Sequence, residues 1–353
     1  MTQKKFSLAI NDALNLAMEI DPGVICFGLG VTDPKGVFGT TLNLEKRFGS
    51  DRVFDMPTSE NAMTGVAIGA ALNGNRSIIT HQRLDFFLLA MDQIINNASK
   101  WHYMFGGQKS VPITVRLIIG RGWGQGPTHS QNLHAWFAHI PGLKVVMPTT
   151  PEDAKGLLLE SIFDPNPVVF LEHRWLHNSM GDVPDGDIRI KLGEAKVAKK
   201  GNDITIVSSS YMTIEALHAA NYLESYGISS EVIDLRTLKP LDWNTIKKSL
   251  DKTGRLLVLD SGFTTCSFAS EIITLAVTES FSKFKYPPVR LAMPDVPEPA
   301  SYELTKGFYI RALDIALKII LITERNIDMN KITTDLQEPV PHDIPGDWFK
   351  GPF

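Results

Sequence analysis

Short apolar runs alternate with helical patterns through the first half of the chain. The runs stay apolar on both faces, as in parallel strands that are covered by helices on either side. This alternation predicts a doubly wound parallel sheet. The predicted strands are Val24–Gly28, Arg52–Met56, Ser77–His81, Val111–Ile119, Lys144–Met147 and Val168–Glu172, and the predicted helices are Asn61–Leu72, Phe86–Trp101 and Pro151–Phe163.

A second, smaller α/β domain follows a polar linker at Asn178–Gly193. Its predicted elements are Ile204–Ser208, Thr213–Tyr226, Glu231–Asp234, Trp243–Leu250, Arg255–Leu259, Ser267–Ser280 and Ala312–Thr323. We therefore expect domains over residues 1–190 and 191–330, and a proline-rich tail over residues 331–353. Because the tail carries Trp348, Phe349 and Phe353, it is expected to pack on a neighbour.

Composition narrows the classes of function. The 353 residues carry 35 basic and 39 acidic side chains, a net charge of −4, so no nucleic-acid partner is expected. No apolar run approaches the ~20 residues of a membrane span, and the amphipathic stretch after Phe6 does not resemble a signal peptide. Two isolated cysteines, Cys26 and Cys266, fit a reducing compartment and a cytoplasmic location.

Several common catalytic motifs are absent. Neither FGLGVTD at Phe27–Asp33 nor GRGWGQG at Gly120–Gly126 has the GxGxxG spacing of a dinucleotide site, and there is no GxSxG or HExxH. His173 and His177 have an i,i+4 spacing that could hold a metal, but no third ligand is evident. Ordinary surface or partner-contact histidines are the favoured interpretation.

Two segments carry the candidate chemistry. RVFDMPTSENAMTGVAIGAALNGN, residues 52–75, places Glu60 at the start of a helix rich in alanine and glycine. A carboxylate there is either stabilised by the helix dipole or held in a dry pocket for a purpose. GRGWGQGPTHSQ, residues 120–131, presents His129 on a glycine-rich loop, where a histidine is either solvated or catalytic.

Together with AMDQIINNASK, LKVVMPTTPEDAKGLL, NPVVFLEH and EVIDLRTLKPLD, these segments resemble a known family. It is the β subunit of thiamine-diphosphate-dependent 2-oxoacid dehydrogenases of the pyruvate, branched-chain and acetoin type, within the transketolase-like superfamily. The resemblance runs from about Phe6 to about Leu321. It implies a pyrimidine-binding first domain and a transketolase C-terminal-like second domain.

The resemblance also implies roles for single residues. Glu60 matches the glutamate that hydrogen-bonds the cofactor's pyrimidine, Phe86 the aromatic that stacks on that ring, and His129 the active-site histidine. The family binds a potassium ion through loop carbonyls. The matching residues are Ile113, Ser161, Ile162, Asp164 and Asn166, although an ordinary Asp-Pro turn explains the same sequence equally well.

One half of the cofactor site is missing. The family's signature for Mg²⁺ and diphosphate, GDG followed by NN, has no counterpart, since Met180–Gly186 reads MGDVPDG. The resemblance therefore implies an α-type partner that supplies the Mg²⁺–diphosphate half, most simply in an α₂β₂ heterotetramer, with the cofactor at the interface. No lipoyl domain is present, so a lipoyl acyltransferase is a further expected partner.

The chain departs from the family around the predicted site. His81, Gln82, Arg83 and Asp85 precede Phe86, and Arg121 and Trp123 lie in the histidine loop. These residues make the approach to the predicted active site more polar and more basic, which suits a phosphorylated or sugar-like acceptor. Alternatively, they only pair with one another, as Arg83 could with Asp85. Oxidative decarboxylation with acyl transfer to a lipoyl group is the favoured function. A transketolase-like or acyloin-forming carbon–carbon ligase subunit and a silent structural subunit are the alternatives.

Overall fold

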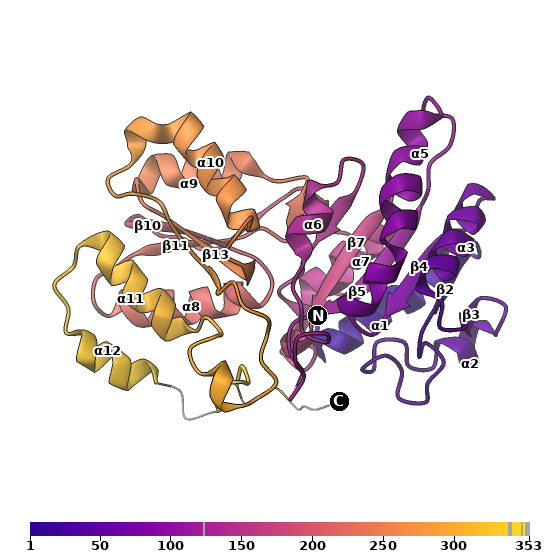
Figure 1. Ribbon diagram of the computed structural model, residues 1–353, viewed down its shortest axis with the longest axis horizontal. Coiled ribbons are helices and arrows are strands. Elements are labelled where there is room, and N and C mark those ends of the chain that lie inside the picture. Colours follow the sequence, from indigo (N-terminus) through magenta and orange to yellow (C-terminus); the bar gives the residue numbers. More distant parts are fainter. Residues whose placement is uncertain (123, 338–340, 347–348, 350–353) are drawn as a thin grey trace.

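The computed structural model describes residues 1–122, 124–337, 341–346 and 349. The larger of its main sheets is mainly parallel and lies in the lobe on the right of Figure 1. Its strand order is β12-β6-β7-β5-β4-β2-β3, and only β12 at the edge runs antiparallel to its neighbour. The strands are β2 (Val24–Gly28), β3 (Val53–Asp55), β4 (Arg76–His81), β5 (Ile113–Ile119), β6 (Lys144–Val146), β7 (Val168–His173) and β12 (Thr237–Lys239).

Helices cover both faces of this sheet. Along β7, Val168 and Phe170 face the hydrophobic cluster that contains α1 (Phe6–Ile20) and α7 (Pro151–Phe163). Val169 and Leu171 face a second cluster that contains α3 (Glu60–Leu72) and α4 (Leu84–Phe87). The period of two with burial on both sides is why the strands read as continuous apolar runs. The predicted doubly wound architecture is confirmed.

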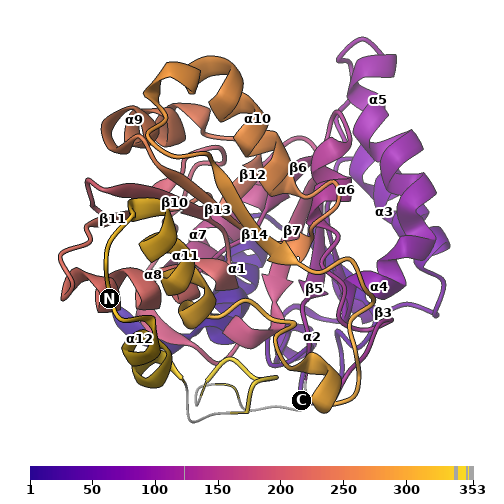
Figure 2. The ribbon, with the colours of Figure 1, turned by 60° about the vertical axis from the view of Figure 1, so that its left-hand side comes forward.

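The smaller sheet lies in the other lobe and has the order β14-β13-β10-β11-β9, parallel except for β9. Helices α9 and α10 cover one face, and α8 and α11 cover the other (Figures 1 and 2). The elements are β9 (Lys196–Lys199), β10 (Ile204–Ser208), α8 (Tyr211–Glu224), β11 (Ser230–Asp234), α9 (Trp243–Thr253), β13 (Leu256–Phe263), α10 (Phe268–Ser280), β14 (Val289–Met293) and α11 (Ala312–Thr323).

The two lobes share their cores and several polar contacts. Each hydrophobic cluster contains residues of both lobes, such as Leu157 with Ile315, and Met63 with Ile246. β12 follows the second lobe's β11 in the chain but pairs with β6 of the larger sheet, where Thr237 lies opposite Val146.

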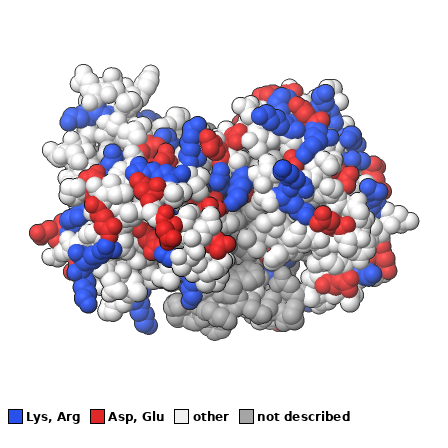
Figure 3. Space-filling model, turned by 180° about the vertical axis from the view of Figure 1, so that it is seen from behind, with Lys and Arg blue, Asp and Glu red and all other residues white. Residues whose placement is uncertain are grey.

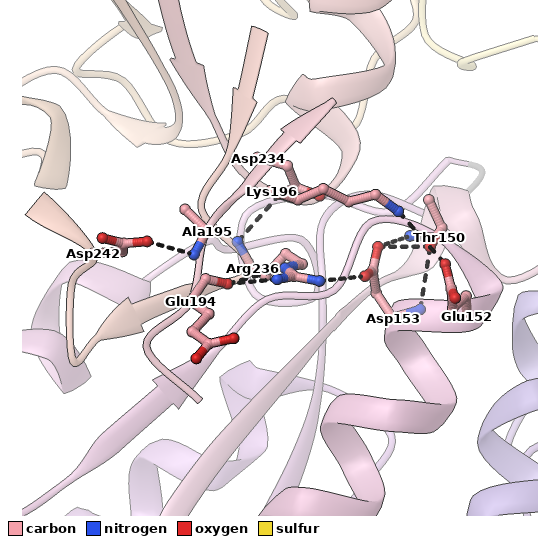
Figure 4. A network of polar contacts seen from close by, with 9 residues as sticks. All are labelled: Thr150, Glu152, Asp153, Glu194, Ala195, Lys196, Asp234, Arg236 and Asp242. Carbon is pink, nitrogen blue, oxygen red and sulfur yellow. Dashed lines mark hydrogen bonds and ion pairs between the residues drawn. The ribbon is translucent and has the colours of Figure 1, made fainter. Parts of the chain in front are cut away.

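A network of polar contacts reinforces this junction (Figure 4). Arg236 Nη2 donates to the carbonyl oxygen of Glu194 at 2.7 Å, and Arg236 Nη1 lies 3.3 Å from the buried Asp153 carboxylate. Asp153 and Thr150 form the capping box that begins α7. The first turn of a helix in one lobe is therefore fixed to the chain that enters the other lobe.

Some sequence-based boundaries were wrong. Residues 86–101 lie in a continuous helical run that changes geometry along its length: α4 leads through η1 (Leu88–Ala90, 3₁₀) and η2 (Gln93–Ala98, π-helical) to α5 (Ser99–Met104). Within the expected linker, β8 (Met180–Val183) pairs with β1 (Thr2–Lys5), because the distant N-terminal segment supplies a partner strand. The remaining short elements are α2 (Leu44–Phe48), α6 (His134–His139), η3 (Arg174–Leu176), η4 (Phe281–Lys283) and η5 (Glu303–Thr305).

The described part of the tail packs on its own chain. Helix α12 (Met329–Leu336) extends across the expected boundary at residue 330. Beyond it, the Asp343 carboxylate lies 3.1 Å from Arg121 Nη2, and the carbonyl oxygen of Ile344 accepts a hydrogen bond from Arg311 Nη1 at 2.6 Å. Trp348 and Phe353 lie outside the described residues, and packing of the tail on a neighbour stays a prediction.

Charges of both signs are interspersed over the face shown in Figure 3, in keeping with the small net charge. Within the described ranges, no helix combines the length and the apolar composition that crossing a bilayer requires.

Candidate active site

A cavity of about 660 Å³ opens at the carboxyl ends of the parallel strands of the larger sheet. In open α/β sheets this edge is where ligands usually bind, and the volume suits a small metabolite. The lining residues come from the segments that follow β2, β4, β5 and β7, which include Phe38, Arg83, Phe86, His129 and Arg174.

The cavity brings together two of the three predicted cofactor and catalytic residues. Phe86 and His129 are half-buried, their ring centroids lie 5.2 Å apart, and the rings are nearly perpendicular at 88°. His129 Nδ1 is 3.0 Å from the Thr128 hydroxyl. The histidine loop is tied to the segment before Phe86, since Gln131 Nε2 donates to Asp85 Oδ1 at 2.7 Å. His129 is therefore held at the rim, where it can contact both solvent and a ligand.

Glu60 begins α3 outside this cavity and is only 5% exposed, although Ser59 and Asn61 on either side are exposed. Among the described residues, no hydrogen bond or ion pair engages its carboxylate. The remaining exposure of the side chain leaves its carboxylate open to water or to a ligand. This arrangement fits a group that hydrogen-bonds a bound ring, and it also places a negative charge favourably at a helix N-terminus.

Two arginines form the polar wall of the cavity. Arg83 is 3% exposed and donates through Nη1 to the carbonyl oxygen of Gly120 at 2.9 Å and through Nη2 to Gln125 Oε1. Arg174 is 2% exposed, and its guanidinium carbon lies 4.4 Å from the centroid of the Phe38 ring. The alternative interpretation, in which Arg83 pairs with Asp85, does not hold in the described part of the chain, where the two form no ion pair.

The other basic residue of the histidine loop has a different role. Arg121 points toward the tail, where it pairs with Asp343 and donates to the carbonyl oxygen of Pro299 at 2.6 Å. It is only 1% exposed and does not line the large cavity. Trp123 of the same loop lies outside the described residues.

His173 and His177 are buried at 4% and 1% exposure, so their assignment to the surface was wrong. Burial lowers the pKa of His173 to about 3 and that of His177 to about 4, which keeps both imidazoles neutral. His173 Nδ1 accepts a hydrogen bond from the backbone amide of Trp175. Across the described ranges, no group of three or more histidine, cysteine or acidic side chains is placed to hold a metal.

The five residues of the predicted potassium site lie on β5, at the end of α7 and in the turn that follows. Arg76 Nη1 donates to the carbonyl oxygens of Ile162 and Asp164, at 3.3 Å each. The carbonyl oxygen of Ser161 accepts from the Thr114 hydroxyl at 3.1 Å. In the turn, the amide of Asn166 donates to Asp164 Oδ1. Several of these carbonyls thus already carry a donor.

Sequence reasoning missed Arg174 and the segment after β2. A usable signal existed, because Arg174 directly follows β7, and polar residues at the carboxyl ends of parallel strands face the ligand edge. The family resemblance does not point to Arg174, because it identifies only the positions that the family uses. Phe38 carried no local signal, as its importance depends on contacts with distant residues.

Comparison with known proteins covers most of the chain. A family model described as the transketolase pyrimidine-binding domain matches residues 2–179, and one described as the transketolase C-terminal domain matches residues 193–315. The β subunit of acetoin:2,6-dichlorophenolindophenol oxidoreductase from Cupriavidus necator is 41% identical over 88% of this chain and 94% of its own length.

A mitochondrial pyruvate dehydrogenase E1 component subunit β-2 from Oryza sativa subsp. japonica is 41% identical over 84% of this chain and 80% of its own length. Among solved structures, a split-gene transketolase described as an inactive β4 tetramer has a TM-score of 0.74. It is 21% identical and matches 90% of this chain and 98% of its own, which shows a shared fold.

Proposed function

We propose that the chain is the β subunit of a thiamine-diphosphate-dependent 2-oxoacid dehydrogenase. The chain belongs to the family of transketolase-like β subunits that includes those of pyruvate dehydrogenase E1 and acetoin oxidoreductase. The observation that carries the proposal is a ligand-sized cavity at the strand ends, in which Phe86 and His129 are in contact. The enzyme is active only when an α-type subunit completes the site.

Each residue then has a separate task. When bound, thiamine diphosphate would supply the nucleophilic carbon for the carbonyl group of the 2-oxoacid. Glu60 would hydrogen-bond the pyrimidine ring and favour its reactive tautomer. Phe86 would orient the ring by stacking. His129, at the rim of the cavity, gives a proton to the substrate oxygen or takes one from it.

The partner subunit supplies what this chain lacks. In the proposed α₂β₂ assembly, the α-type subunit holds Mg²⁺ and the diphosphate group, and a lipoyl acyltransferase accepts the acyl group. We place a potassium ion at the carbonyls of Ile113, Ser161, Ile162, Asp164 and Asn166. A carbonyl oxygen has two lone pairs, so a hydrogen bond from Arg76 or Thr114 leaves one for the cation.

A carbon–carbon ligase that works with the same kind of partner is the second candidate function. The specific observation in its favour is the pair of buried arginines in the cavity wall, Arg83 and Arg174. A lipoyl arm has no group that needs two cations, whereas a phosphorylated acceptor does. In both functions Glu60, Phe86 and His129 act in the same way.

The test is Glu60→Gln in the reconstituted complex. The amide keeps the shape of the side chain but cannot act as the acid, so the turnover of 2-oxoacids should fall by roughly 10²- to 10⁴-fold. Glu271→Gln is the matched control, because Glu271 is an exposed glutamate in the first turn of α10. Full activity of Glu60→Gln, with partner binding intact, would refute the assignment.

A further inference from the structure

Arg83 and Arg174 are two buried cations to which the described residues supply no buried anion in an ion pair. Both line the 660 Å³ cavity, and within the described residues neither forms an ion pair. Arg174 Nε is buried and has no hydrogen-bond partner among the residues that the structure describes. Burial lowers the pKa of each guanidinium to about 10, and for Arg83 the charge of Arg174 adds to this. Both remain charged at neutral pH, so they repel each other across the wall of the cavity.

The nearby acids do not supply the missing charge. Burial raises the pKa of Glu298 to about 8, so this carboxyl group is mostly neutral at pH 7. Asp85 accepts a hydrogen bond from Gln131 and forms no ion pair with Arg83 in the described part of the chain. Asp33 and Lys35, which also line the cavity, are exposed and carry opposite charges. The cavity wall therefore keeps an excess of positive charge.

The aromatic residue beneath the two cations has a strained backbone conformation. Phe38 has a φ of +50°, in the left-handed region that bulky residues avoid. Its ring lies under both guanidinium groups, 4.4 Å from that of Arg174 and 5.7 Å from that of Arg83. The ring of Phe349 in the tail also lies near Arg174, with its centroid 5.5 Å from the guanidinium carbon. Planar guanidinium groups fixed on aromatic rings present a rigid set of donors.

The position of the pair relative to the reacting groups limits what it can bind. Arg83 lies three residues before Phe86, and Arg174, Phe86 and His129 line the same cavity. A ligand whose reacting carbon lies beside Phe86 and His129 can therefore extend a second group to the arginines. Carboxylates and phosphates are the groups that two charged donors bind best.

We propose that Arg83 and Arg174 form an anion subsite that binds a carboxylate or phosphate at the end of the substrate remote from its reacting carbonyl. The inference rests on the proposed function, and it identifies the substrate class as a 2-oxoacid, or an aldehyde acceptor, with a second, anionic end. Lys35 at the exposed rim of the cavity attracts the same ligands.

The first test measures binding without turnover. Inorganic phosphate is titrated into the full-length chain at constant ionic strength, by calorimetry. Arg83→Gln and Arg174→Gln should each weaken binding by roughly tenfold or more, since a charge-assisted hydrogen bond is lost. Arg174→Lys should retain part of the affinity. Arg325→Gln, at an exposed arginine, is the control. Equal binding by the wild type and Arg174→Gln, or none by the wild type, would overturn the subsite.

The titration is repeated on the complex with the α-type subunit at saturating thiamine diphosphate. Phosphate binding that persists supports a substrate subsite. Displacement of phosphate by thiamine diphosphate would instead assign the arginines to the cofactor and overturn the proposal.

The second test compares matched substrates in that complex. 2-Oxoglutarate and 2-oxopentanoate differ by a terminal carboxylate, and glyceraldehyde 3-phosphate and glyceraldehyde differ by a phosphate. In one pair, the kcat/KM ratio should favour the anionic member and fall by roughly 10- to 100-fold in Arg174→Gln. A response of the first pair would show that the anionic end belongs to the 2-oxoacid, and a response of the second pair that it belongs to the aldehyde acceptor. Ratios that are unchanged in both pairs would refute the inference.

The two failures can be told apart. If the complex turned over none of the four compounds while phosphate binding still depended on Arg174, the proposed function would be wrong and the anion subsite would stand. If turnover depended on Glu60 but not on either arginine, the function would stand and the subsite would be wrong.

Discussion

The buried ion pair of Arg116 and Glu172 gives a quantitative test of how charge is managed inside the larger sheet. Arg116 on β5 and Glu172 on β7 are 1% and 0% exposed, and two hydrogen bonds of 2.6 and 3.0 Å join them side by side. Burial alone would raise the pKa of Glu172, but the Arg116 guanidinium and the hydrogen bonds outweigh it and lower that pKa. In the wild type this carboxylate is therefore stable and charged.

Arg116→Met removes the cation and leaves the acid in place. Of the partners that the described residues give Glu172, His177 then remains, with Nε2 at 3.4 Å and the imidazole neutral, so the carboxyl group is expected to take up a proton. Holding a glutamate with an ordinary pKa near 4.3 protonated at pH 7 costs about 3.7 kcal/mol. This value lies in the range of roughly 3–5 kcal/mol that breaking a buried pair usually costs. At pH 5 the same step costs only about 1 kcal/mol.

The sign of the pH dependence of stability distinguishes the wild type, with Glu172 charged, from Arg116→Met, with Glu172 protonated. A depressed folded pKa, as in the wild type, gives stability that is lost as the pH falls through it. A raised folded pKa, as in Arg116→Met, gives stability that is present at low pH and lost as the pH rises. The double variant Arg116→Met/Glu172→Gln has neither dependence and should recover most of the loss at pH 7.

Urea unfolding at pH 5 and pH 7, followed by circular dichroism, measures these differences in the free energy of unfolding. Arg325→Met, at an exposed arginine, controls for the substitution itself. The reasoning fails if Arg116→Met costs less than about 1 kcal/mol at pH 7, or if its cost is the same at both pH values.

Two further predictions concern pH and potassium. Burial raises the folded-state pKa of Glu298 to about 8, above its unfolded value near 4.3, so its contribution to stability is present at low pH and is lost as the pH rises through 8. Glu298→Gln should therefore reduce the fall in Tm between pH 5 and pH 9, and an unchanged slope would contradict this. If loop carbonyls bind potassium, replacing K⁺ by Li⁺ at equal ionic strength should lower the Tm by roughly 2 °C or more, whereas equal values would exclude the site.

Sequence patterns predicted the elements whose burial follows from local order. β2, β10, α7 and α11 begin and end where the apolar pattern predicted. Elements that depend on distant partners were missed, such as β12 and the pairing of β8 with β1. Short strands without an apolar run, such as β1 (TQKK) and β12 (TLK), carry too little pattern to be recognised, and the strand that they join decides their existence.

The candidate site divides in a similar way. The resemblance located Phe86 and His129, and the structure brings their rings into contact. The role of Glu60 stays a prediction, because it depends on a cofactor whose proposed site is shared with a second chain. The arginine wall could not be read from sequence order, since Arg83 and Arg174 come from different strand ends, and only the fold makes them neighbours.

The position of β12 has a consequence for how the protein can be divided. β6 would otherwise end the larger sheet, with a row of free backbone donors and acceptors that any extended chain could join. The second lobe supplies the strand that blocks this edge, and Arg236 beside it anchors the block to α7. A fragment cut at residue 190 would keep the residues that line the cavity but lose this protection against aggregation. The second lobe thus covers the edge of the sheet that carries the site and prevents other chains from pairing with it.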